Sequence, residues 1–166
     1  MDEEKVKDRQ MAMIAYVVYT GLFAGIFWSS IGCLAYFLNF TEIRSNVILE
    51  PWAIGDWKTG WLGTVISIIL MGVFSIVAAL IYYAVLKNIS NRWIGIIYGL
   101  VLFSLVFLVL NPIFPGIKPF QEIDRNTMIT SGCLYVVYGV FIGYSISYEQ
   151  QNRKGTVQRH TNEHSQ

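Results

Sequence analysis

Four long apolar stretches, separated by short polar segments, dominate the pattern of hydrophobic and polar positions along the chain. None of them contains Asp, Glu, His, Lys or Arg; they are residues 10–41, 59–86, 93–117 and 126–148. Each is longer than the roughly 20 residues that a helix needs to cross a hydrocarbon layer about 30 Å thick. Lipid offers backbone amides no hydrogen-bond partner, and these runs lack the alternation of barrel strands, so they predict membrane-spanning helices.

The predicted fold class is therefore all-α, an integral membrane bundle of four transmembrane helices. We place the spans near residues 11–38, 61–86, 93–113 and 127–148. We expect residues 1–10 to form a cytoplasmic N-terminal segment, 11–148 the four-helix domain, and 149–166 a disordered cytoplasmic tail without apolar residues for a core. The fourth span carries eight Leu, Ile, Val and Phe against fourteen in the second, so we expect it to be the helix most enclosed by protein.

The basic residues indicate how the bundle is oriented, because Lys and Arg resist translocation across the membrane. Eight of them fall on the side that holds both termini and four on the other side. The first group is Lys5, Lys7, Arg9, Lys87, Arg92, Arg153, Lys154 and Arg159, and the second is Arg44, Lys58, Lys118 and Arg125. This asymmetry predicts that both termini are cytoplasmic.

Composition supports a membrane protein and narrows the classes of partner. Hydrophobic residues make up 54% of the 166 residues, charged residues only 14%, and the mean hydropathy is +0.48. The formal net charge is +1, and no basic face is large enough to neutralise a run of phosphates. We therefore expect the lipid bilayer as the surroundings of the chain and no nucleic-acid partner.

Small residues at helical spacing mark the faces on which the helices are expected to pack. The hydrophobic effect does not drive helices together in lipid, so close packing of their backbones has to stabilise the association. The helix-packing candidates are Gly21, Gly25 and Ser29 in the first span, Gly95 and Gly99 in the third, and Gly139 and Gly143 in the fourth. The spacing does not distinguish packing within one chain from packing between two copies.

The first outer loop carries acidic and aromatic side chains that could contact a partner. Its interaction candidates are Glu50, Trp52, Asp56 and Trp57. Indole rings prefer the headgroup layer of a membrane, so a solvated loop anchored by its aromatic residues is the simpler interpretation.

Candidate chemistry is scarce. His160, Glu163 and His164 match the HxxEH pattern of inverted zinc peptidases, but they lie in a polar tail that does not provide the buried helix such a site needs. No span offers a His or Lys that could activate a serine. We expect no catalytic residue, no cofactor and no metal site. Cys33 and Cys133 fall at similar depth near the outer ends of their spans, and the sequence leaves open whether they are close or bonded.

Two segments resemble a known family. Residues 46–61, NVILEPWAIGDWKTGW, and residues 138–148, YGVFIGYSISY, are similar to the YqhR-like family of small membrane proteins from Bacillus-type bacteria. The resemblance covers nearly all residues between the tails. It implies a bacterial plasma membrane and four helices, and it transfers no activity, because the family has no assigned function.

These observations lead to a functional hypothesis and two alternatives. We expect a non-enzymatic partner or scaffold of a membrane complex, which contacts another membrane protein or a second copy through its small-residue faces or its outer loop. The first alternative is a component of a transporter or channel for an uncharged or lipid-like solute. The second alternative is a membrane-embedded enzyme that acts on lipid or envelope precursors.

Overall fold

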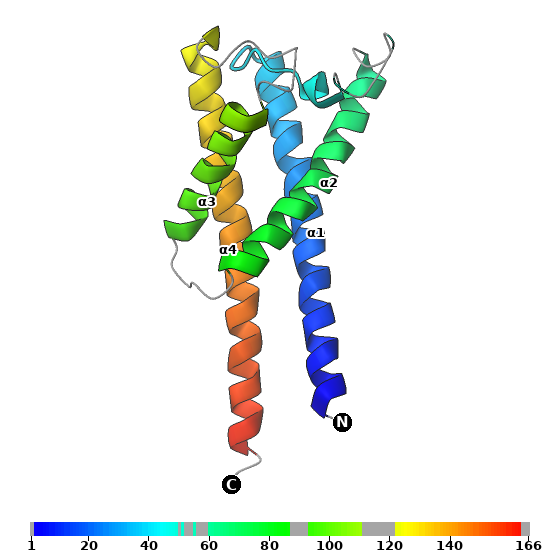
Figure 1. The fold of residues 1–166 in the computed structure, drawn as a ribbon, viewed down its shortest axis with the longest axis vertical. Coiled ribbons are helices and arrows are strands. Elements are labelled where there is room, and N and C mark those ends of the chain that lie inside the picture. The colour runs from blue at the N-terminus through cyan, green and yellow to red at the C-terminus, as the bar shows by residue number, and fades with distance from the viewer. Residues whose placement is uncertain are drawn as a thin grey trace.

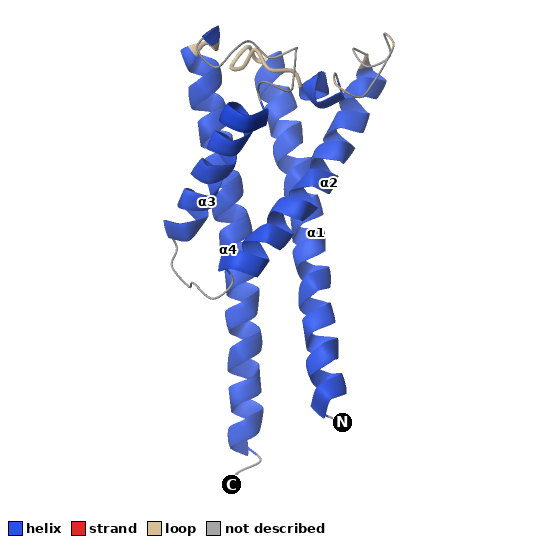
Figure 2. Ribbon diagram, in the orientation of Figure 1, coloured by secondary structure: helices blue, strands red, loops and turns tan. Residues whose placement is uncertain are grey.

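A computed structural model shows an all-helical chain. It describes residues 2–49, 51, 55, 60–86, 93–110 and 122–163, and the regular structure within these residues is helical, without a strand (Figure 2). The elements are α1 (Asp2–Phe37), the short 3-10 helix η1 (Ser45–Leu49), α2 (Trp61–Leu86), α3 (Trp93–Ser104), the π-helix η3 (Leu105–Leu110) that continues α3, and α4 (Arg125–Glu163).

The C-terminal end of α1 is closed by a Schellman motif. Asn39 adopts a left-handed backbone conformation with φ of 60°, which asparagine tolerates better than most residues. The amide of Phe40 donates to the carbonyl of Ala35 at 2.9 Å, and the amide of Asn39 donates to the carbonyl of Tyr36 at 3.0 Å. Both bonds satisfy carbonyls that the helix would otherwise leave free, so the helix ends here.

Asp124 caps the beginning of α4. Its side-chain oxygen Oδ2 accepts a hydrogen bond from the amide of Asn126 at 3.2 Å, and its carbonyl accepts the first helical bond, from Met128, at 3.1 Å. A carboxylate at this position also interacts favourably with the helix dipole.

Both long helices continue past the apolar stretches that the sequence predicts as spans. α1 has 36 residues and α4 has 39, which corresponds to about 54 Å and about 58 Å of helix. The predicted disordered tail from residue 149 is thus corrected up to Glu163, where the structure is helical. A helix that has already formed extends without a new nucleation step, and Arg153 Nε donates to Glu149 Oε1 at 2.7 Å, one turn apart.

The helices form two pairs, α1 with α2 and α3 with α4, and the contacts within each pair are far more extensive than those between pairs. α1 and α4 contact each other and connect the pairs, whereas α2 approaches α4 only over a short stretch. Both termini lie at the same end of the molecule, where α1 and α4 extend beyond α2 and α3 (Figure 1).

Three helical stretches in the described part of the chain are long and apolar enough to cross a membrane: Lys7–Phe37, Trp61–Val85 and Arg125–Arg153. The helix over Trp93–Val109 is apolar but shorter. In the most apolar stretch of each long helix, α1 has 33% of its residues buried, α4 28% and α2 22%. The expectation that the fourth span is the most enclosed is therefore wrong, because α1 shares the largest helix–helix contact, with α2, and also packs on α4.

Glycines allow the backbones to approach closely within each pair. A methyl group at Gly25 would lie 2.5 Å from Ser75 Cβ and 2.7 Å from Gly72 Cα, so α1 meets α2 without room for a side chain. In the other pair, a methyl group at Gly139 would lie 2.5 Å from the carbonyl oxygen of Gly95 and 2.6 Å from Gly99 Cα. Such contacts between backbones are what drives helix association in lipid.

Replacing Gly139 by alanine should loosen the α3–α4 pair. The added methyl group meets backbone atoms, which cannot rotate away, so we expect a loss of about 1–3 kcal/mol in stability. Thermal unfolding of the purified protein in mild detergent measures this loss. Gly132→Ala is the matched control on the same helix, because a methyl group there has no neighbour within 4 Å. Equal melting temperatures for the two variants would contradict the packing described.

Candidate functional site

Ser75 lies where three helices meet in the interior of the bundle. Its hydroxyl donates to the carbonyl of Gly21 on α1 at 2.6 Å, and its Oγ lies 2.6 Å from the hydroxyl of Tyr138 on α4. Because the Ser75 proton is directed at Gly21, Tyr138 is the donor in the second bond. A serine within a helix commonly bonds to the carbonyl four residues earlier, as Ser67 does with Gly63 at 2.7 Å. Ser75 reaches another helix instead, because Gly21 allows α1 and α2 to approach closely.

Two further tyrosines extend this arrangement toward α3. Tyr98 donates its hydroxyl to the carbonyl of Ala78 on α2 at 2.6 Å. The hydroxyl of Tyr82 lies 3.3 Å from Ser147 Oγ and 3.5 Å from the carbonyl of Gly143, both on α4. The rings of Tyr82 and Tyr98 pack edge to face, with centroids 5.0 Å apart.

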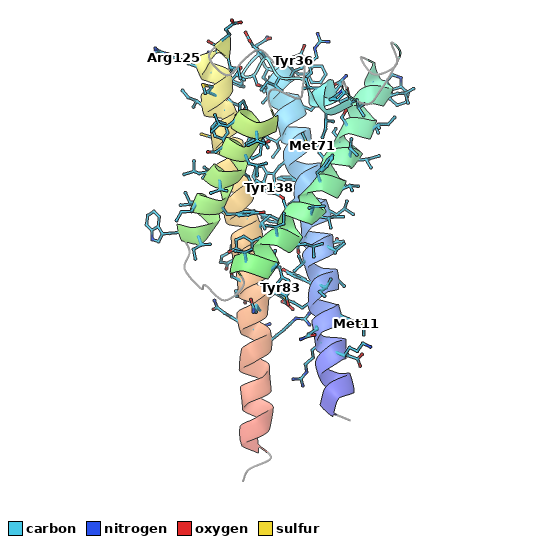
Figure 3. The ribbon with its side chains drawn as sticks, in the orientation of Figure 1. Met11, Tyr36, Met71, Tyr83, Arg125 and Tyr138 are labelled. Atoms are coloured by element: carbon cyan, nitrogen blue, oxygen red, sulfur yellow. The ribbon has the colours of Figure 1, made fainter. Side chains whose placement is uncertain are left out.

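We refer to Ser75, Tyr82, Tyr98, Tyr138 and Ser147 as the hydroxyl cluster. Tyr138 lies near the middle of the bundle, where α4 faces the neighbouring pair (Figure 3). Tyr82, Tyr98, Tyr138 and Ser75 are all buried, with Tyr82 only 1% exposed. A buried hydroxyl without a partner would be costly in a lipid environment, and each member of the cluster has one.

The chemistry of this cluster is that of neutral donors and acceptors. Each hydroxyl is held by another helix, and the spans carry no Lys, His, Asp or Glu that could act as a base beside it. Among the described residues, no group of three or more His, Cys, Asp or Glu could hold a metal ion. The arrangement therefore connects helices through neutral hydrogen bonds.

A second polar contact joins the pairs where α1 ends and α4 begins. The amide of Glu42, in the segment that follows α1, donates to Thr127 Oγ1 at the beginning of α4, at 3.0 Å. Thr127 is 1% exposed. Nearby, Arg44 Nε donates to the hydroxyl of Tyr36 at 2.6 Å, and its guanidinium lies 5.3 Å from the centre of that ring. These bonds order the beginning of the segment that joins α1 to α2, as far as the structure describes it.

The structure divides the helix-packing candidates between the two pairs. Gly21 and Gly25 face α2, and Gly95, Gly99 and Gly139 lie between α3 and α4. Gly143 faces both Gly95 and the hydroxyl of Tyr82. Ser29 bonds within its own helix, to the carbonyl of Ile26 at 3.2 Å. The tight contacts at these glycines are made within one chain.

The other sequence candidates do not join this cluster. Glu50, Trp52, Asp56 and Trp57 lie outside the described residues. Cys33 and Cys133 are free thiols, so no disulfide joins α1 to α4.

Sequence reasoning missed the hydroxyl cluster and the face of α2 that carries it. Gly72, Ser75 and Ala79 follow one another at intervals of three and four residues, which places three small residues on one face of α2. Gly21 and Gly25 pack against this face. Tyr138 lies near the middle of the apolar run 126–148, away from the membrane interfaces where tyrosine is common, and is the signal that could have identified the cluster.

Comparison with known proteins assigns the chain to a family. The profile of a family described as "Conserved membrane protein YqhR" matches residues 1–161. The chain is 48% identical over 149 residues to a Bacillus subtilis (strain 168) protein named "Uncharacterized protein YqhR", covering 88% of this chain and 84% of that protein. No solved structure matches the chain. The chain thus belongs to the YqhR family of conserved membrane proteins.

Proposed function

We propose that the protein is a non-enzymatic partner or scaffold of a membrane complex. The observation that carries this proposal is the state of the hydroxyl cluster, in which the interior hydroxyls bond one helix to another. An interior of this kind stabilises a shape and does not offer a reactive group to a substrate. A protein with such an interior acts through its surface.

The proposal includes four crossings with both termini in the cytoplasm. α3 and η3 together span 18 residues and return the chain from the end of α2 toward the end where α4 begins (Figure 1). Both termini then lie on one side, where eight of the twelve Lys and Arg are located. Membership in a family with a Bacillus relative supports the bacterial plasma membrane as the location.

Two surfaces would be available to a partner in this topology. On the cytoplasmic side, α1 and α4 extend beyond the other two helices. On the outer side, the first outer loop carries the acidic and aromatic candidates Glu50, Trp52, Asp56 and Trp57. The partner is another membrane protein or a second copy of this chain.

Reporter fusions test the topology. A periplasmic-type reporter joined after residues 45, 90, 120 or 166 should be active at 45 and 120 and inactive at 90 and 166, because each span reverses the side. A cytoplasmic-type reporter at the same four positions is the control and should give the opposite result. Equal activity at 90 and 120 would show that the third apolar helix does not cross the membrane.

Affinity purification after crosslinking in intact cells tests the role as a partner. We expect one membrane protein, or a second copy, at a fixed stoichiometry, and a reduced yield of it in a Trp52→Ala/Trp57→Ala variant. Trp61→Ala is the matched control, because this tryptophan is already 74% exposed at the start of α2. A monomeric particle without a companion, or saturable solute flux in proteoliposomes, would contradict the proposal.

A further inference from the structure

The contacts within the helix pairs differ in kind from the contacts between them. Within the pairs, glycines bring backbone against backbone: a methyl group at Gly25 would meet Gly72 Cα at 2.7 Å, and one at Gly95 would meet Val140 Cα at 2.9 Å. Backbone atoms cannot rotate out of such a contact. Each pair therefore behaves as one rigid body. Its two helices separate only if all the backbone contacts between them are lost.

Between the pairs, α2 meets α3 and α4 mainly through the ends of long side chains. Tyr98 reaches from α3 to a carbonyl of α2, Tyr138 reaches from α4 to Ser75, and Tyr82 reaches from α2 to Ser147. The backbones of α2 and α4 approach each other only over a short stretch. A side chain that bridges a wider spacing can release its partner by a rotation, without disturbing its own helix.

Exchanging the hydrogen bonds of the hydroxyl cluster for other partners also changes the free energy only slightly. A hydrogen bond between membrane helices contributes only about 0.6 kcal/mol on average, because the separated groups find other partners. Ser75 has such an alternative in its own helix, the bond to the carbonyl four residues earlier that Ser67 makes. Breaking the hydrogen bonds between the pairs therefore requires much less free energy than separating the glycine contacts within a pair.

α1 and α4 provide the contact about which the pairs could turn. They are the only helices of different pairs whose backbones pack extensively in the described residues. The rings of Phe23 on α1 and Phe141 on α4 lie 6.3 Å apart in this contact. It lies beside the hydroxyl cluster, so a rotation about it would separate α2 from α3 and α4 first.

We propose that the two helix pairs move as rigid bodies about the α1–α4 contact, and that the hydroxyl cluster holds them in the closed arrangement. The chain then has two states, closed and open, that differ by a few neutral hydrogen bonds, and anything that prefers one state shifts the population toward it. This inference stands independently of the proposed role as a partner.

Distance measurements between spin labels test this motion in the full-length protein in lipid nanodiscs, with Cys33 and Cys133 replaced by alanine. Labels introduced by Val77→Cys on α2 and Val137→Cys on α4 report the distance between pairs. Labels introduced by Tyr19→Cys on α1 and Val77→Cys report the distance within one pair. These three positions are exposed on the helix surface, at 70% for Tyr19, 52% for Val77 and 46% for Val137.

The variant Tyr98→Phe/Tyr138→Phe removes two hydroxyls and keeps both rings. The loss of each hydroxyl should raise the ratio of open to closed molecules about threefold, so the double variant should raise this ratio by up to about tenfold. The distance between pairs should then gain a longer population, while the distance within the pair stays unchanged. Tyr98→Phe alone removes only the bond to Ala78, should act in the same direction by about threefold, and replaces the double variant if that variant does not fold.

The matched control is Tyr144→Phe/Tyr148→Phe, which changes two exposed tyrosines of α4 whose rings stack with each other outside the cluster. It should leave both distances unchanged. Two results would overturn the proposal. In one, the distance between pairs is the same with and without the cluster hydroxyls; in the other, the distances within and between pairs broaden together, as in a general loosening.

Discussion

Helices in lipid gain nothing from hiding apolar surface from one another, and this constraint governs the whole structure. Association has to come from close packing and from hydrogen bonds, and this chain uses each in a different place. Glycine contacts hold α1 to α2 and α3 to α4. Hydroxyl bonds connect the resulting pairs. The hydroxyl bonds depend in part on the glycine contacts, because at Gly21 the two helices lie close enough for Ser75 to reach the Gly21 carbonyl.

The neutrality of the interior follows from the same constraint. A charged side chain in the middle of a bilayer requires a charged or strongly polar partner, whereas a hydroxyl is satisfied by a single carbonyl. Main-chain carbonyls have a second lone pair, so Gly21 and Ala78 can accept a tyrosine or serine hydroxyl without leaving their helices. The chain can maintain a specific helix arrangement in this way without Asp, Glu, His, Lys or Arg inside its apolar stretches.

The sequence predicted the all-helical class correctly, because long charge-free runs have few other solutions in lipid. α2 occupies residues 61–86, the range expected from its apolar run. The beginning of α1 and the end of α4 were harder to predict, since polar residues such as Glu149 and Arg153 end the apolar run without ending the helix. The hydroxyl cluster escaped prediction for a different reason. A tyrosine in a sequence carries no sign of which neighbour its hydroxyl reaches, and Tyr98 finds a backbone carbonyl that no side-chain pattern reveals.

Because α1 and α4 are long, a small tilt of either helix displaces its far end by a large distance. From Phe23 to the first residue of α1 the helix measures about 32 Å, and from Phe141 to the end of α4 about 33 Å. A tilt of about 10° around the Phe23–Phe141 contact would displace each far end by about 6 Å, close to the rise of one helical turn. A small tilt of the helices thus becomes a large displacement of their ends, and a neighbouring molecule bound at that end would be moved with them.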